Sequence, residues 1–585
     1  MKRMKRTFIF GVIMGWLMAF GMAQVPENTT YQEAFSQAYQ ACPDVPRGWL
    51  EAIAFTNTHC HHLTDDHYFH EGPDAMPRAY GLMGLVKDGK GYFRENLHLV
   101  SQLSGIAEED ILASPTANVT AYAMAFSRLA NELKAADTQG FLSVIERLSE
   151  LPIGEEKDVY PMQSMLYSVC LFLNDADKAA QYGFPQADID LKAVFAEHYE
   201  LLHAPVLGVN RSPDYPPAIW DPAPECNWEP RTKQVSAVVI HYTEGSYAGC
   251  ISWFKNCDAE VSAHYVIRSA DGQITQMVLE KDKAWHARTA NGYTIGIEHE
   301  AYGNIWSFFT PEMYQSSANL LRSICERYDT ISGHRTFYMD TLDNGYCLNN
   351  GLHSLGGEGA CIEIRGHQHY PDQSHTDPGP YWDWNYYYKL INEGTPINVL
   401  EGEQGRLDHT NYGDDERRIW VIRGPEGSTV SIHFDNFHLE QDYDFLWIYD
   451  GDNVYARKIG RWNTQSPRTV TASGNVMCLE FRSDCLTTDA GWEATWTAAN
   501  TNALSHAEDA SLCVAPTPFT DRFTITAEAD FAELQVYDLY GNLLFTDAHF
   551  EKAITIDASQ WASGVYMVSV KSANGKVQVL KLVKL

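Results

Sequence analysis

A proline-rich stretch divides this chain into parts with different periodicity. Residues 211–230 hold six prolines, a residue that helix interiors and central strands exclude. Before the stretch, segments such as NVTAYAMAFSRLANELKAA space apolar residues three or four apart, as in an amphipathic helix. After it, runs such as VSAVVIHYTEG and YTIGIEHEAYG end at glycine and indicate strands. We therefore predict several domains, as a length of 585 residues also requires.

The same patterns predict the fold class of each part. Residues 24–205 are expected to be all-α, and residues 206–396 to form an α/β domain with a central mixed sheet and a helix at 311–328. Residues 397–499 alternate like strands and predict a β-sandwich. Residues 511–585 predict a second, smaller β-sandwich.

The N-terminal residues indicate export. MKRMKRTFIFGVIMGWLMAFGMAQ runs from basic residues through an apolar stretch to small residues, which predicts a signal peptide over residues 1–23; an uncleaved anchor is the alternative. No later run approaches the ~20 apolar residues of a membrane span. A formal charge of -33 argues against nucleic acid as a partner.

Export makes disulfides the expected state of the twelve cysteines. Sequence alone leaves the connectivity open. The candidate pairs are those close in sequence: Cys250 with Cys257, Cys347 with Cys361, and Cys478 with Cys485.

Two histidines and an aspartate predict a metal site. His241 ends an apolar strand, and His367 and Asp377 lie in the loop RGHQHYPDQSHTDPGPYWDW. Two imidazoles and one carboxylate leave a fourth tetrahedral position open, as in catalytic zinc sites. The residue before a proline is extended, so His375 should point into the site beside Asp377 while Thr376 faces away.

A further carboxylate would move protons. Glu298 in IGIEHE lies on a strand whose neighbours Ile297 and His299 face the other side. The pieces VVIHYTEG, SAHYVI, AWHA, IGIEHE and GHQHYPDQSHTDPGP cover about a quarter of the chain. In this order they resemble the zinc-dependent N-acetylmuramoyl-L-alanine amidase family, which is related to the peptidoglycan recognition proteins.

The resemblance implies that His241, His367 and Asp377 bind Zn²⁺, that Glu298 activates the attacking water, and that His375 stabilises the oxyanion. It implies cleavage of the amide between N-acetylmuramic acid and L-alanine in peptidoglycan. Two alternatives stay open: a peptidoglycan-binding protein without turnover, and a glycosidase carried by the N-terminal domain. The residues implied on the substrate side are His264, Tyr265 and His286, of which the first two could equally be packed strand residues.

The helical region carries a second resemblance. RGWLEAIAFTNTHC, AYGLMGLV and SGIAEEDILASPTANVTAYAMAFSRLA resemble the lysozyme-like fold of lytic transglycosylases. Those enzymes need a protonated glutamate. Asn57 and Thr58 stand where the family has Glu-Ser, and Gly84 replaces a glutamine, so we expect a non-catalytic glycan-binding domain. Glu51 and Glu71 are possible substitutes for the missing acid.

The nearby segment HCHHLTDDHYFH has five histidines and Cys60 within twelve residues. No spacing in it matches a closed zinc site. We therefore expect a solvated loop with Cys60 in a disulfide, and a metal site is the alternative.

The two C-terminal modules resemble known families as well. FDNFHLEQDYDFLWIYDGDN with CLEFRSDCLTTDAGWEATW resembles a CUB domain, a module that usually binds protein or glycan. Calcium-binding members hold the ion with a glutamate and two aspartates, which match Glu440, Asp444 and Asp484; solvated acidic loops are the alternative.

The tail, with GVYMV and KLVKL, resembles the C-terminal sorting domain of type IX secretion substrates, although the family's Pro-Asn-Pro opening is Pro516-Thr517-Pro518 here. This resemblance implies a Gram-negative cell, the type IX machinery as a partner, and a secreted or cell-surface location.

Overall fold

The structure is a computed structural model. It describes residues 31–68, 72, 75–202, 211–303, 305–337, 354–500 and most of 512–584. The predicted signal peptide, Cys347, Glu71 and Pro516-Thr517-Pro518 lie outside the described residues. The chain divides into two compact units, the second of which is formed by Ala498–Leu585 with Pro425–Thr429. Within the described part, no helix is both long enough and apolar enough to cross a membrane.

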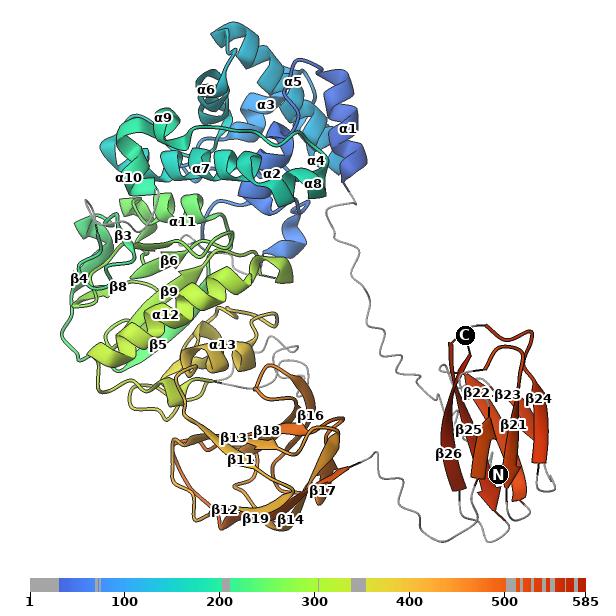
Figure 1. Cartoon of the computed structure of the whole chain (residues 1–585). Helices are drawn as coiled ribbons and strands as arrows, with labels where there is room; N and C mark the ends of the chain where they lie inside the picture. Colours follow the sequence, from blue (N-terminus) through green and yellow to red (C-terminus); the bar gives the residue numbers. More distant parts are fainter. Residues whose placement is uncertain are drawn as a thin grey trace, which may run out of the picture. The chain divides into compact units, whose positions relative to one another are not determined.

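The N-terminal region is helical, as predicted, with one two-stranded ribbon of β1 (Ala79–Tyr80) and β2 (Leu85–Val86). Its long helix α5 begins where the Ser114 side chain accepts a hydrogen bond from the backbone N–H of Ala117 and proline follows at the first position. The helices, blue to teal in Figure 1, are α1 (Gln32–Ala41), α2 (Trp49–Thr58), α3 (Asn96–Ser104), α4 (Glu108–Leu112), α5 (Pro115–Leu133), α6 (Thr138–Leu148), α7 (Glu156–Asn174), α8 (Ala176–Tyr182), α9 (Leu191–Phe195) and α10 (Tyr199–Leu202).

The α/β domain is built on a six-stranded mixed sheet in the order β10-β5-β9-β6-β7-β3. The first four strands in this order run parallel to one another, so their carboxyl ends meet at one edge. The strands are β3 (Ile219–Trp220), β5 (Ala237–Tyr242), β6 (Tyr265–Ile267), β7 (Ile274–Gln276), β9 (Thr294–His299) and β10 (Ile364–Gly366); β4 (Trp228–Pro230) pairs separately with β8 (Asp282–Ala284).

Helices cover both faces of this sheet. On one face, α12 (Pro311–Arg327) and α13 (Trp384–Ile391) pack with Ile240 of β5 and Ile297 of β9. Because strand residues alternate, His241 and Glu298 point to the opposite face. There α11 (Tyr247–Trp253) belongs to the same apolar core as the N-terminal helices, so the two regions share one interior.

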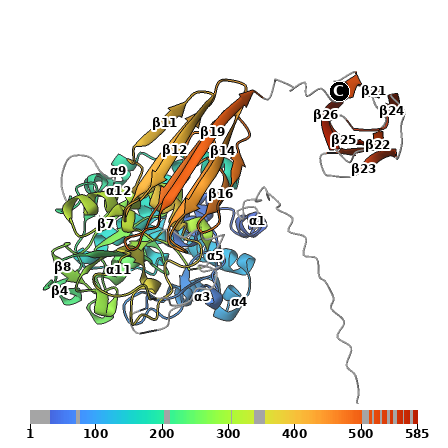
Figure 2. The same cartoon turned by 90° about the horizontal axis from the view of Figure 1, so that it is seen from below.

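The next domain is a β-sandwich, as predicted, with both sheets visible in yellow and orange in Figure 2. Its sheets have the orders β11-β13-β18-β15-β16 and β12-β19-β14-β17. The strands are β11 (Ile397–Glu401), β12 (Gln404–Thr410), β13 (Arg417–Arg423), β14 (Ser428–His438), β15 (Phe445–Asp450), β16 (Arg457–Trp462), β17 (Thr469–Thr471), β18 (Val476–Arg482) and β19 (Gly491–Asn500).

The C-terminal unit is a smaller β domain around Phe523, Val536 and Val568. Its sheets have the orders β20-β21-β24 and β23-β22-β25-β26. The strands are β20 (Leu512–Ala515), β21 (Arg522–Ala527), β22 (Phe531–Asp538), β23 (Leu543–Asp547), β24 (Ala553–Asp557), β25 (Gly564–Ser572) and β26 (Val577–Lys584).

A buried ionic cluster joins the first sandwich to α13. Glu480 of β18 accepts hydrogen bonds from Arg417 at 2.8 Å and from Arg482 at 3.0 Å. Both guanidinium groups lie over the ring of Tyr388, which α13 places in the core of the sandwich. Arg482 also donates to the side chain of Asn385 in α13. The sandwich is therefore packed against the α/β domain rather than tethered to it.

The disulfides differ from the pairs expected from sequence proximity. Cys257 pairs with Cys226: each lies in a short 3₁₀ helix, Cys257–Ala259 and Glu225–Asn227, and their Cα atoms are 5.5 Å apart. Cys250 lies inside α11 as a buried thiol. Cys60, expected in a disulfide, is also a buried thiol, and burial raises its pKa to about 12.

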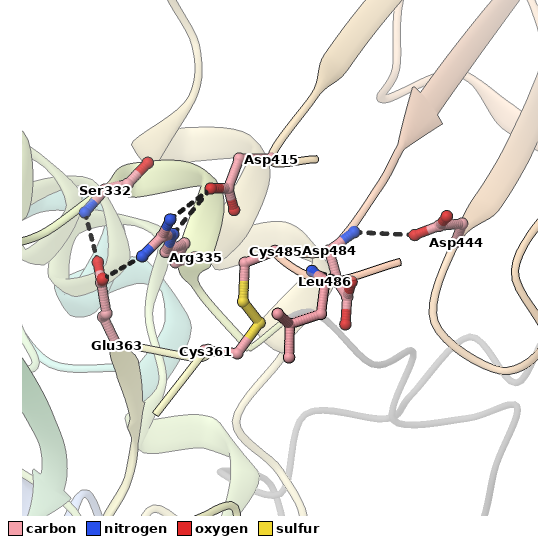
Figure 3. The surroundings of a disulfide bond; sticks show 9 residues. All are labelled: Ser332, Arg335, Cys361, Glu363, Asp415, Asp444, Asp484, Cys485 and Leu486. Atoms are coloured by element: carbon pink, nitrogen blue, oxygen red, sulfur yellow. Dashed lines mark hydrogen bonds and ion pairs between the residues drawn. A yellow bond between two sulfur atoms is a disulfide. The ribbon is translucent and has the colours of Figure 1, made fainter. Parts of the chain in front are cut away.

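The second disulfide joins two domains. Cys361, which precedes β10, pairs with Cys485, which follows β18, with their Cα atoms 5.7 Å apart (Figure 3). Cys478 points into the core of the sandwich from β18 and does not reach Cys485, since a strand rises about 3.3 Å per residue. Arg335 of the α/β domain forms an ion pair with Asp415 of the sandwich at 2.7 Å beside this bond (Figure 3).

Candidate active site

The sheet topology brings the predicted metal ligands to one edge. His241 is near the carboxyl end of β5, and Glu298 lies directly opposite it on the parallel neighbour β9. His367 follows the last residue of β10, which pairs with β5 on its other side. The loop after β10 then returns Asp377 to the same edge. The ends of three parallel strands and the loop after β10 thus place four polar side chains in one cavity.

Asp377 lies between the two imidazoles. Its carboxylate oxygens are 2.7 Å from Nδ1 of His241 and 3.1 Å from Nδ1 of His367, and all three side chains are buried. One ligand atom from each residue lies within 4.8 Å of the others. Ligands of a tetrahedral zinc ion at about 2.1 Å lie about 3.4 Å from one another, so this donor set fits such an ion.

The protonation states also suit a cation. Burial acts to raise the pKa of Asp377, but His367 and His241 outweigh it and hold the pKa well below its usual range. Burial, with His367 nearby, lowers the pKa of His241 to about 4 against the opposing effect of Asp377. Asp377 is therefore ionised and His241 is neutral, and these are the forms in which a carboxyl group and an imidazole bind a metal ion.

Second partners fix how the two rings are turned. Nε2 of His367 is 2.7 Å from Oε1 of Gln373, and Nε2 of His241 is 3.0 Å from Nδ1 of His286. Because Nε2 of each ring is engaged, Nδ1 faces Asp377. Residues that hydrogen-bond to metal ligands typically fix the orientation of those ligands in this way. Gln373 was not predicted from the sequence. The available signal was its side-chain amide in the metal-binding loop, two residues before His375.

Glu298 is a carboxyl group without a full set of partners. Its Oε2 is buried and has no hydrogen-bond partner among the described residues. Burial, and then the charges of Asp377 and Glu244, raises its pKa well above the ordinary value. A carboxyl group beside the ligand set with an uncommitted oxygen is suited to exchange protons with a bound molecule.

These residues line a cavity of about 330 Å³. His375 lines it, as expected, and also stacks on His367 with ring centroids 4.7 Å apart. Thr376, which was expected to face away, lines it too. Ala75 and Met76 of the helical region complete the wall, which the sequence did not reveal. The N-terminal region therefore contributes to the site.

Two of the three predicted substrate contacts lie elsewhere. His264 is fully buried, with Nδ1 accepting from the backbone of Gly296, and Tyr265 is fully buried and donates to Glu280. Strand pairing around β6 encloses both, so the expectation that they contact substrate is corrected. His286 does line the cavity.

The acidic residues of the sandwich also converge. Glu440, Asp444 and Asp484 each offer an oxygen within 4.8 Å of the others. Asp444 accepts from the hydroxyl of Tyr412 at 2.5 Å and from the backbone N–H of Asp484 at 2.9 Å. Burial, together with the neighbouring carboxylates, raises the pKa of Glu440 to about 7 and burial raises that of Asp444 to about 6. Such crowding of carboxylates is relieved when a cation binds.

The residues of the second resemblance lie against the α/β domain. The backbone carbonyl of Asn57 accepts from the hydroxyl of Tyr302, and Thr58 is fully buried. Glu51, a possible substitute acid, is buried in the helical core and accepts from Tyr39 at 2.5 Å. Within the described residues, the histidine-rich segment forms no group of three metal-binding side chains.

Comparisons with known proteins agree with this domain order. Family profiles match N-acetylmuramoyl-L-alanine amidase over residues 231–380, the CUB domain over residues 398–496, and the secretion system C-terminal sorting domain over residues 513–584. N-acetylmuramoyl-L-alanine amidase A of Achromobacter lyticus is 42% identical over 188 residues, which cover 31% of this chain and 97% of that protein.

Other similarities are partial. Procollagen C-endopeptidase enhancer 2 of Mus musculus is 34% identical over 110 residues, 17% of this chain and 26% of that protein. The solution structure of the PlyG catalytic domain is 14% identical, covers 30% of this chain and 93% of its own, and has a TM-score of 0.22. From the sequence matches, the chain belongs to the N-acetylmuramoyl-L-alanine amidase family and carries a CUB domain and a secretion system C-terminal sorting domain.

Proposed function

We propose that this protein is a secreted zinc hydrolase that cleaves the amide bond between N-acetylmuramic acid and L-alanine in peptidoglycan. The observation that carries the proposal is the convergence of His241, His367 and Asp377 beside Glu298 at one sheet edge. Membership of the amidase family supplies the substrate class. We propose the domain limits given by the sequence, 24–205, 206–396, 397–499 and 511–585, for this enzyme.

In this proposal His241, His367 and Asp377 hold the zinc ion. The chemistry that bound zinc supplies is that of a Lewis acid, which polarises a carbonyl and acidifies water. Glu298 takes a proton from the attacking water through its uncommitted Oε2 and delivers it to the nitrogen of the leaving L-alanine. His375, at the cavity wall, donates to the oxygen that gains negative charge, and His286 contacts the substrate.

Supporting residues keep these groups in place. Gln373 holds His367 through Nε2 and donates its amide to the backbone carbonyl of Ala287, which ties the loop to the domain. Arg288 donates to the carbonyl of Asp372 and to the hydroxyl of Ser374, so it fixes the segment that carries His375. The geometry of the site is thus set before substrate binds, which lowers the cost of reaching the transition state.

The other modules have separate roles in the proposal. The oxygen set of Glu440, Asp444 and Asp484 suits Ca²⁺, and the CUB domain would bind a protein or glycan. The sorting domain supports export by type IX machinery to the cell surface or medium.

Mass spectrometry of purified peptidoglycan tests the function. The proposal expects new alanine amino termini, their loss with chelator, and their return with zinc. New reducing or anhydro sugar ends without alanine termini would instead support a glycosidase, and an absence of any cleavage would support a binding protein. Glu298→Gln is the matched control, since it keeps the size of the side chain and the metal ligands.

A further inference from the structure

A second cavity lies between the helical region and the amidase domain. Its volume is about 940 Å³, against about 330 Å³ at the metal site, and no residue lines both cavities. One wall comes from α2, α7 and α8 and the other from the amidase domain between Ser246 and Glu312. The described structure therefore offers a ligand-sized space that the proposed hydrolysis does not use.

Residues at the same sheet edge as the metal site line this cavity. Glu298 lies opposite His241 on β9, and Glu300, two residues further on, lines the second cavity. Arg268, which directly follows β6, lines it as well. Because β5, β9 and β6 are parallel neighbours, their carboxyl ends lie side by side. The two cavities are therefore lined by residues from neighbouring strand ends of one sheet.

Aromatic rings form part of the second cavity. His59 is stacked between Phe55 and Phe308, with ring centroids 4.5 Å and 3.9 Å away. Burial lowers the pKa of His59 well below its usual value, so this ring is neutral. Trp306 also lines the cavity and is 47% exposed, an unusual position for the largest apolar side chain. An exposed ring of this kind can pack against the C–H face of a sugar.

The polar lining suits a ligand with hydroxyl and amide donors. Among the described residues, five carboxyl side chains line the cavity, together with the basic side chains Lys178 and Arg268. Arg268 is already paired with Asp271, through hydrogen bonds of 2.8 Å and 2.6 Å. Lys178 lies 4.2 Å above the ring of Phe55. Glu300 accepts from the backbone N–H groups of Tyr247 and Ser269, and Asp175 from those of Asp177 and Lys178. The carboxylates of Asp177 and Glu312 are the ones placed to accept hydrogen bonds from sugar hydroxyls.

We propose that this cavity binds the uncharged, N-acetylated glycan strand of the polymer whose peptide is cleaved at the metal site. The identity of the polymer rests on the proposed function. The strand stacks on Trp306 and donates hydroxyl hydrogen bonds to carboxylates such as Asp177 and Glu312. Binding there holds the enzyme on its insoluble substrate and lowers the KM for peptidoglycan relative to a short soluble substrate.

Calorimetric titration with tetra-N-acetylchitotetraose tests the inference, because this probe has no stem peptide to cleave. We expect saturable binding by the full chain, and about a tenfold or larger rise in Kd for Trp306→Ala and for Asp177→Asn. Both residues line the cavity and are exposed rather than part of the core, and the second substitution is nearly isosteric. Tyr443→Ala removes a 56% exposed ring from the CUB domain and should leave the Kd unchanged.

Two results would overturn the inference: no saturable heat up to about 10 mM probe, or equal binding by all three variants and the wild type. Titration with the free stem tripeptide gives a further arm, since binding that Trp306→Ala abolishes would assign the cavity to peptide instead. Hydrolysis of a soluble muramyl tripeptide is measured separately. Its absence, with chitotetraose binding intact, refutes the amidase proposal and leaves the glycan-binding cavity supported.

Discussion

Removal of the disulfide between Cys361 and Cys485 is the sharpest test of how the CUB domain is joined to the amidase domain. The bond links residues 124 apart in sequence. Closing a loop of that length removes chain entropy from the unfolded state worth about 5 kcal/mol, against about 4 kcal/mol for a loop the size of that closed by Cys226 and Cys257. The Cys361→Ser/Cys485→Ser variant should therefore lose up to about 5 kcal/mol of unfolding free energy.

Guanidinium unfolding followed by tryptophan fluorescence gives the measurement, because Trp447 and Trp492 are buried in the CUB domain. The Cys226→Ser/Cys257→Ser variant is the control for loss of a disulfide within one domain. Mild reductant should shift the unfolding midpoint of the wild type toward that of the Cys361→Ser/Cys485→Ser variant. The midpoint of that variant, which has no interdomain disulfide to reduce, should not shift in this way. An unchanged midpoint for Cys361→Ser/Cys485→Ser would refute the reasoning, as would alkylation of Cys361 and Cys485 in the native wild type, located by peptide mapping.

Four further predictions concern single side chains. Glu298→Gln should lower kcat about 10²- to 10⁴-fold with zinc content unchanged, measured by hydrolysis and metal analysis; an unchanged kcat would remove Glu298 as the base. Gln373→Ala should weaken zinc binding about 10- to 100-fold in a chelator competition, and unaltered affinity would contradict its orienting role. Burial opposes ionisation of Glu480, but Arg482 and Arg417 hold its pKa to about 2, below the unfolded value of about 4.5; its stabilisation is present above pH 4.5 and lost as the pH falls toward 2. Glu480→Gln should lose about 3–5 kcal/mol at pH 7 and flatten that acid dependence in thermal melts, whereas parallel pH profiles would refute it. Ca²⁺ should raise the Tm of the wild type and not of Asp444→Asn, and equal shifts would place calcium elsewhere.

Much of the fold follows from local patterns. The run of apolar residues that ends at His241 predicts a buried strand, and the alternation around Glu298 predicts that Ile297 faces away from it; the structure has both. Proximity of His241, His367 and Asp377 was also predicted, from a histidine at the end of an apolar strand, the histidine- and aspartate-containing loop, and the resemblance to the amidase family. These features depend on side-chain periodicity and parallel strand ends, which a sequence expresses directly.

The errors concern contacts between distant segments. Cys485 lies close to Cys478 in sequence, yet a strand directs Cys478 into the core and Cys485 meets Cys361 of another domain. Met76 reaches the metal cavity from the helical region, a neighbour that no local pattern indicates. The motif around His264 predicts a residue that lines the cavity, but His264 directly precedes β6 and is fully buried. Such contacts depend on domain packing, which spacing along the chain does not encode.

Hydrolysis of a soluble N-acetylmuramoyl tripeptide by metal-free and zinc-reconstituted protein tests the central claim most directly. The account predicts one zinc per chain, release of the tripeptide with a free L-alanine amino group only when zinc is present, and loss of both zinc and activity in His367→Ala. Release of the tripeptide by the metal-free protein, or zinc binding that His367→Ala leaves intact, would contradict it.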